Sequence, residues 1–363
     1  MAESLPLPTL LSQTLVAFTI EIDNAFEQRM PHDEERLAAT REERLARSRA
    51  PRGPWITSYA MYANFMRFLP PEGLAAHALE GPMKLTNFAG LLRWGYVRAA
   101  PERPDARKRD WLVTPTEAGM QAQTVWAPLS REVEARWEGR YGEEAVAALH
   151  AALAVIAGEL DPGLPAYLPV VRWALRTDPP PLSAFEAPDD LCSLLARVLL
   201  AFTLDFERDF PVALPICADV LRVLDERPVR LADLPHRGHV SREAISMAFS
   251  GVKGADLVAL EADSQAGRGQ TARLTAKGLA AKVAYRARLA AIEADWRDRY
   301  GAAAIDALRA ALTPLVGLGD ETSPLMAAIV PPPGGWRAQR RYRRIALPHH
   351  PMILHRGAWP DGA

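Results

Sequence analysis

The sequence has few cysteines, no long hydrophobic run and almost no net charge, and each absence excludes a class of protein. Two cysteines, Cys192 and Cys217, among 363 residues cannot form a disulfide framework and are typical of buried thiols in a reducing cytoplasm. No apolar run approaches the ~20 residues of a membrane-spanning helix, so we expect no membrane partner. No basic region precedes the first apolar residues, so we also expect no signal peptide and a cytoplasmic location.

The motifs of common enzymes are also missing. The sequence has no P-loop, no Rossmann glycine fingerprint, no GxSxG elbow and no HExxH pair, so nothing combines a nucleophile with a base. Three histidines near the end, His349, His350 and His355, lack cysteine or carboxylate ligands at a metal-binding spacing. We therefore expect no enzyme, no cofactor and no metal site.

A formal net charge of −1 argues against a globally basic coat for nucleic acid. It does not exclude local basic surfaces that bind nucleic acid, because binding depends on where the charges lie.

What the chain does contain is an internal repeat. The segments EARWEGRYGEEAVAALHAAL (134–153) and EADWRDRYGAAAIDALRAAL (293–312) are identical at 12 of 20 positions, at a constant offset of 159. The opening segment LLSQTLVAFTIEIDNAF (10–26) likewise matches LLARVLLAFTLDFERDF (194–210), at an offset of 184. The difference means that the first copy is 25 residues longer, and most of that excess fits the charged segment 31–54.

Each copy has the same order of expected elements. Apolar residues spaced by three and four predict a long amphipathic helix at the start of each copy. Shorter helices, a two-stranded hairpin, a long helix and a final helix follow. We therefore divide the chain into copy one (1–160), a proline-rich linker (161–189), copy two (190–317) and a tail rich in Pro, Arg and His (318–363).

The middle of copy two has the local pattern of a helix-turn-helix. A short helix near 231–234 precedes a turn, and Ser241 is a suitable N-cap for the next helix. Ile245, Ala248 and Val252 recur at helical spacing and should face the core, whereas Arg242 and Ser246 should face outward. A strand, a glycine-rich tip and a return strand follow.

Copy one repeats this pattern with a more basic hairpin. Thr86 or Asn87 should cap the corresponding helix, and strands are expected near Tyr96–Val97 and 111–113. Residues 98–111 carry five basic and three acidic side chains, whereas residues 259–273 carry two of each. Copy one should therefore bind phosphates more strongly through its hairpin.

This order of elements resembles the MarR family of bacterial transcription regulators, as do RPDARKRDWLVTPTEAG (103–119) and SREAIS (241–246). The resemblance implies winged helices, binding to double-stranded DNA and control by a small apolar or aromatic effector. Members act as two-fold dimers joined through their terminal helices. A fused pair therefore predicts a mainly α protein with small β-wings, in which one monomeric chain forms an intramolecular pseudo-dimer around a shared helical core.

The candidate residues follow from these positions. The recognition helices and wings supply the expected DNA-binding residues Lys84, Thr86, Asn87, Arg93, Arg103, Arg107, Lys108, Arg109, Ser241, Arg242, Ser246, Arg268 and Arg273. Capping alone would equally explain Thr86, Asn87 and Ser241. An effector pocket in copy one would be lined by Phe18, Tyr59, Tyr62 and Phe65, although helical spacing of this kind also describes an ordinary core.

Two other functions stay open. The absence of net charge on the second wing also fits a pseudo-dimeric scaffold for protein contacts. The fold would equally suit a ligand-binding protein that recognises no operator. The arginine-rich segment 337–344 could follow a phosphate backbone or lie across the acidic surface of its own chain.

Overall fold

The computed structural model describes residues 5–30, 59–86, 88–168, 185, 188–238, 245–246, 248–249, 252, 254–263, 269–317 and 323–325. These residues form a mainly helical protein with two small antiparallel sheets, which confirms the expected combination of helices and small β elements. The charged segment 31–54, most of the linker 161–189 and nearly all of the tail 318–363 lie outside the described residues.

The first half of the chain has short elements between long helices. In order, these are α1 (Leu7–Arg29), α4 (Tyr59–Asn64), the 3-10 turn Met66–Phe68, β1 (Leu74–Ala75), the 3-10 turn Ala76–Leu79, α5 (Glu80–Leu85), α6 (Phe88–Arg93), β2 (Val97–Ala100), the 3-10 turn Lys108–Asp110, β3 (Leu112–Pro115), α7 (Glu117–Trp126), α8 (Leu129–Tyr141) and α9 (Glu143–Gly158).

The second half follows a similar order. Its elements are α10 (Leu191–Arg208), α11 (Leu214–Ile216), the π-helical turn Cys217–Leu221, β4 (Val229–Arg230), the 3-10 turn Leu231–Asp233, α12 (Leu234–Gly238), β5 (Val258–Ala262), β6 (Gln270–Leu274), α14 (Ala276–Tyr300) and α15 (Ala302–Val316).

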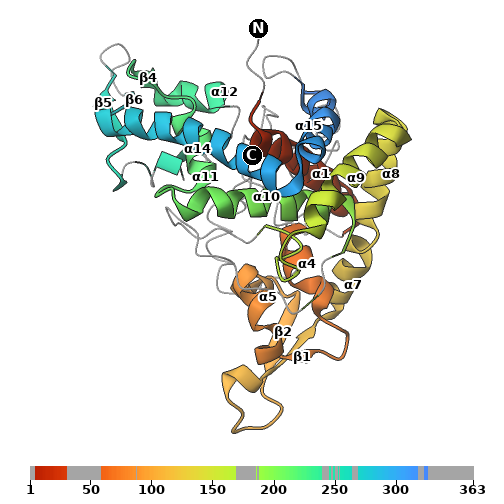
Figure 1. Cartoon of the computed structure of the whole chain (residues 1–363). Coiled ribbons are helices and arrows are strands. Elements are labelled where there is room, and N and C mark those ends of the chain that lie inside the picture. Colours follow the sequence, from red (N-terminus) through yellow and green to blue (C-terminus); the bar gives the residue numbers. More distant parts are fainter. Residues whose placement is uncertain are drawn as a thin grey trace.

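Helices from both halves of the chain pack together in the centre. Helix α1 packs along α10 and α15, and α9 packs along both α15 and α10. Figure 1 shows the two sheets far apart, β4–β6 at the upper left and β1–β2 at the lower end, with α10 in the middle of the molecule. The helices that join the halves are therefore the first and last helices of each sequence copy.

The two sheets have the same topology. Their strand orders are β1-β3-β2 and β4-β6-β5, and all four strand pairs are antiparallel. The sequence predicted the hairpins β2–β3 and β5–β6, but it did not predict the third strands, β1 and β4. Each of these has only two residues, too few to show an alternating pattern.

The long helix expected after the hairpin is continuous in the second half only. Helix α14 runs unbroken from Ala276 to Tyr300, whereas the corresponding stretch of the first half is divided into α7 and α8. Pro128 is the N-cap of α8. Proline has no backbone N–H for the helical hydrogen bond and its ring crowds the preceding turn, so Pro128 favours a break at this point.

The repeated tryptophans make equivalent contacts in the two halves. The rings of Trp137 and Phe18 are 4.9 Å apart at 70°, and those of Trp296 and Phe202 are 5.1 Å apart at 66°. Both tryptophans are fully buried. The offsets of 159 and 184 found in the sequence therefore relate residues that pack in the same way.

Each tryptophan also donates a hydrogen bond to an acid on the first helix of its own half. The indole Nε1 of Trp137 lies 2.7 Å from Oε1 of Glu21, and that of Trp296 lies 2.9 Å from Oδ2 of Asp205. Because a buried carboxylate is costly unless it is paired, these donors stabilise acids that enter the core.

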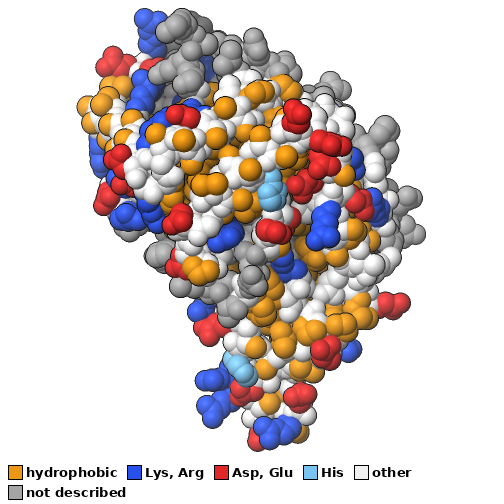
Figure 2. Space-filling view, turned by 45° about the vertical axis from the view of Figure 1, so that its right-hand side comes forward, with side chains coloured by type: hydrophobic (Ala, Val, Ile, Leu, Met, Phe, Trp, Pro, Cys, Tyr) orange, Lys and Arg blue, Asp and Glu red, His pale blue; other side chains and the backbone are white. Residues whose placement is uncertain are grey.

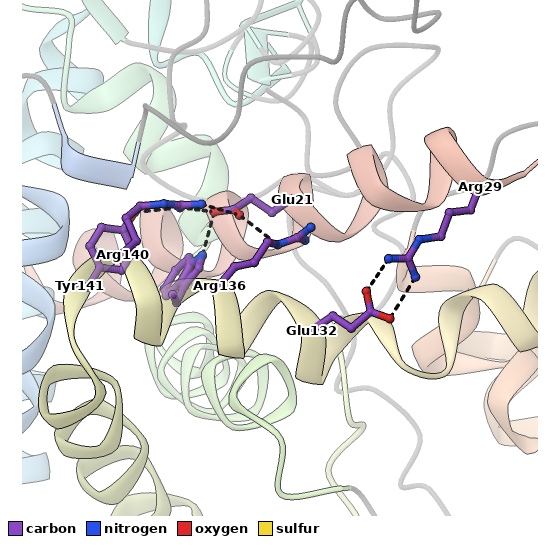
Figure 3. Close-up of polar contacts among 7 residues, drawn as sticks. Glu21, Arg29, Glu132, Arg136, Arg140 and Tyr141 are labelled. Atoms are coloured by element: carbon purple, nitrogen blue, oxygen red, sulfur yellow. Dashed lines mark hydrogen bonds and ion pairs between the residues drawn. The ribbon is translucent and has the colours of Figure 1, made fainter.

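Glu21 has further partners on α8. Its carboxylate receives two hydrogen bonds from Arg140, at 2.9 and 3.2 Å, and Nε of Arg136 is 4.0 Å away. Figure 3 shows both arginines reaching from α8 to Glu21 on α1, with Arg29 and Glu132 paired further along the same two helices. The hydrogen bond that Arg140 donates to Glu21 raises the pKa of Arg140, so this guanidinium stays charged.

Glycine is required where the helix after each sheet begins. Thr116 and Thr275 cap these helices by accepting hydrogen bonds from the amides of Gly119 and Gly278. A Cβ on Gly119 would lie 2.0 Å from the carbonyl oxygen of Tyr96, and one on Gly278 would lie 2.0 Å from that of Leu257. The helix can approach the strand this closely only because glycine lacks a side chain.

We expect Gly119→Ala to destabilise the protein by roughly 1–3 kcal/mol, because overpacking against fixed backbone forces the helix away from the strand. Gly139→Ala is a matched control in α8, where an added Cβ meets no atom within 4 Å. The control should stabilise the helix by about 0.5–1 kcal/mol. Urea unfolding followed by circular dichroism measures both, and equal stabilities for the two variants would contradict the close approach.

Candidate nucleic-acid interface

The β2–β3 hairpin carries a group of basic side chains at one end of the molecule. Arg103, Arg107, Lys108 and Arg109 are all exposed. Figure 2 shows Lys and Arg side chains at the lower end of the molecule, where Figure 1 places β1 and β2, with some acidic side chains among them. An exposed hairpin of this kind can bring several cations to one phosphate backbone.

Backbone hydrogen bonds shape the tip of this hairpin. The amide of Ala106 donates to the carbonyl of Arg103 at 3.0 Å, and the amide of Asp110 donates to that of Arg107 at 2.8 Å. The indole of Trp111 donates to the carbonyl of Ala106 at 3.3 Å. The tip is therefore a folded turn that holds its cations on a defined frame.

Acidic side chains compensate only part of the hairpin's charge. Asp110 lies 3.6 Å from Nε of Arg109 and 3.7 Å from Nδ1 of His77, which also lies 3.2 Å from the carbonyl oxygen of Arg109. Arg103, Arg107 and Lys108 form no ion pair with another residue that the structure describes. These three cations are the part of the hairpin best suited to bind phosphate.

The expected recognition helix is α6, which follows α5 and contacts β2. Lys84 is exposed and donates to Glu80 at 2.7 Å, and this hydrogen bond lowers the pKa of the Glu80 carboxyl. Arg93 is exposed, with its guanidinium 5.3 Å from the ring centre of Trp94. Arg93 is thus a further exposed cation of this half, whereas the charge of Lys84 is compensated by Glu80.

Not every expected DNA-binding residue has exposed surface. Thr86 is 1% exposed and is the C-cap of α5, so its side chain cannot reach a base edge in this structure. On α6, Leu91 is buried, whereas Leu92 is 37% exposed. Asn87, the other expected cap, lies outside the described residues.

The second half is described less fully at the corresponding positions. Ile245, Ala248 and Val252 are buried and Ser246 is exposed, in agreement with the expected faces of the helix. Arg273 is paired with Glu261, with 2.9 Å between Nε and Oε1. The expected residues Ser241, Arg242 and Arg268 lie outside the described residues.

The residues expected to line an effector pocket belong to the hydrophobic core. Phe18, Tyr59 and Phe65 are at most 3% exposed, and Tyr62 is partly buried against them. The ring centres of Tyr59 and Tyr62 are 5.7 Å apart, and Phe65 packs on Phe88 at 5.3 Å. Burial raises the pKa of Tyr59 well above its ordinary value.

Sequence reasoning missed several acids that decide the charge of the interface. Glu80, Glu261 and Asp263 each pair with a basic side chain. Of these pairs, only Glu80–Lys84 has a local signal, since residues four apart face each other on a helix. The other two depend on strand pairing, which composition and local periodicity do not specify.

Within the described part of the chain, no three His, Cys, Asp or Glu side chains come together to hold a metal ion. No described helix is both long and apolar enough to cross a membrane. The chain matches no protein-family model, no curated protein and no solved structure in the comparisons made.

Proposed function

We propose that this protein is a DNA-binding transcription regulator in which one chain forms a winged-helix pseudo-dimer. The observation that carries the proposal is the folded β2–β3 hairpin with three exposed cations, Arg103, Arg107 and Lys108, that form no ion pair with another described residue. Such cations release counterions when they neutralise phosphates, and this release provides most of the non-specific affinity for DNA.

The pseudo-dimer is supported by contacts that recur in both halves. The sheets share one topology, and the Trp137–Glu21 pair has its counterpart in Trp296–Asp205. The first and last helices of the two copies pack against each other, as the terminal helices of a two-fold dimer would. Gene fusion would make that partner permanent.

The proposed mode of binding follows from the order of elements. Helix α6 would enter the major groove, and the hairpin would follow the neighbouring backbone or minor groove. Arg93 at the end of α6 and Lys84 on α5 would contact phosphate or base edges beside it. Two heads on one core would read sites about 34–36 Å apart along DNA, one helical turn.

Control by a small apolar or aromatic effector remains part of this proposal, on the strength of the family resemblance alone. Because Phe18, Tyr59 and Phe65 are buried in the core, an effector beside them would have to separate packed side chains. That movement would alter the spacing of the two heads and lower the affinity for DNA, since a ligand acts through its different affinities for two states.

Fluorescence anisotropy with a random-sequence duplex tests the function directly. We expect binding at ~50 mM salt, with an affinity that falls steeply as the salt concentration rises. No binding at that salt concentration would contradict DNA binding and favour the protein-interaction scaffold. Selection of tight binders from a random duplex library would then identify the operator that a regulator must read.

A further inference from the structure

The two hairpins place their charges differently at matched positions of the strands. Arg98 on β2 pairs in register with Thr114 on β3, whereas Ala259 on β5 pairs with Arg273 on β6. Thr114 and Arg273 are related by the offset of 159 found in the sequence. In the first hairpin the cation donates a 2.9 Å hydrogen bond to the neutral Thr114 hydroxyl, so its charge is not cancelled.

The second hairpin has an acid where the first has alanine. Ala100 pairs in register with Leu112, and Glu261 pairs with Thr271, which is again 159 residues beyond Leu112. The Glu261 carboxylate accepts a hydrogen bond from Arg273 at 2.9 Å across β5 and β6. Glu261 therefore neutralises the cation that could otherwise face phosphate.

A second pair acts in the same sheet. Arg230 on β4 lies 2.9 Å from Oδ2 of Asp263, whose side chain is 6% exposed. The corresponding strand of the first sheet, β1, consists of Leu74 and Ala75 and contains no charged residue. The two arginines described in the second sheet, Arg230 and Arg273, are thus both paired with acids on or next to β5.

We infer that Glu261 makes DNA recognition one-sided, so that the first hairpin holds the phosphates on one flank of an asymmetric site and the second hairpin does not. This inference rests on the proposed function. Arg273 is already paired, and the half-exposed Glu261 carboxylate repels an approaching phosphate. The second hairpin therefore adds no net positive charge through these residues, and a protein gains affinity only from the phosphates that it neutralises.

Single charge changes in the full chain test this asymmetry. At ~0.1 M salt, Arg107→Gln should weaken binding to a random duplex by roughly 8-fold and reduce the salt slope by about 0.9, the value for one lost phosphate contact. Arg273→Gln should change the affinity by less than about 2-fold, because the second hairpin of the wild type holds no phosphate, so the substitution removes no phosphate contact. Glu261→Gln should strengthen binding by up to ~8-fold, since it leaves Arg273 unpaired by an acid.

Arg131→Gln is the matched control, because Arg131 is exposed on α8, a helix that Figure 1 shows apart from the strands of both sheets. Thermal melts of each variant test whether unfolding causes a loss of DNA affinity. Hydroxyl-radical footprints on the selected operator should protect one outer flank in the wild type and both flanks in Glu261→Gln.

Two results would overturn the one-sided reading while leaving DNA binding intact. One is a symmetric wild-type footprint, and the other is a loss for Arg273→Gln as large as that for Arg107→Gln. A wild-type chain that fails to bind DNA at ~50 mM salt would instead contradict the proposed function, and this inference with it.

Discussion

Replacing Arg103, Arg107 and Lys108 together by glutamine should lower the affinity for duplex DNA on the order of 100-fold or more at ~0.1 M salt. These three exposed cations form no ion pair with another described residue, so their full charge is available to phosphate. Losing three phosphate contacts should also reduce the slope of log K against log salt by about 2.7. Fluorescence anisotropy over a series of salt concentrations measures both quantities.

The loss should be similar for random duplex and for the selected operator, because phosphate contacts carry no direct sequence information. Lys84→Gln is a comparison variant, since Lys84 is already paired with Glu80. This substitution should lower the affinity for DNA less than the loss of any one of the three hairpin cations. An unchanged salt slope in the triple variant would show that the hairpin does not touch DNA, and the proposed DNA binding would then require another surface.

Trp137→Ala should destabilise the folded protein by about 3–5 kcal/mol, the usual cost of removing a large buried aromatic side chain. Trp137 is fully buried against Phe18, and its indole is a hydrogen-bond donor to Glu21, which is itself 5% exposed. The variant would therefore leave a cavity and take one partner from a buried carboxylate. Denaturant unfolding followed by far-ultraviolet circular dichroism measures the loss.

Two comparison variants separate the causes. Trp137→Phe keeps much of the ring packing but removes the indole donor, so it should cost roughly 1–3 kcal/mol, as expected for a buried acceptor that loses a partner. Trp296→Ala should lower the free energy of unfolding by about as much as Trp137→Ala. The contacts of Trp296 with Phe202 and Asp205 are equivalent to those of Trp137.

The same measurement tests the shared core. Helices α1, α9, α10 and α15 pack across the two halves, so both tryptophan variants should shift one common unfolding transition. Two separate transitions, each moved by only one of the variants, would mean that the halves fold independently. That result would contradict the proposed pseudo-dimer without bearing on the hairpin.

Helix α1 shows what local sequence patterns can predict and what they cannot. The spacing of Leu11, Phe18 and Phe26 correctly predicted one buried face, because helical periodicity is a local property. In the structure, almost all sides of α1 are buried, including the side chains of Thr14 and Asp23. These polar residues would face solvent on an ordinary amphipathic helix, and only packing by several other helices explains their burial.

The sequence by itself determined the helical class, the duplicated order of elements and the places of the two hairpins, because these follow from periodicity, capping residues and the offsets between the copies. Only the tertiary structure decided which charges are cancelled. Glu21 meets Trp137 across 116 positions of the chain, and Glu261 meets Arg273 through strand register. Such partners are chosen by packing between distant segments, so the charge left unpaired on each hairpin cannot be counted from composition.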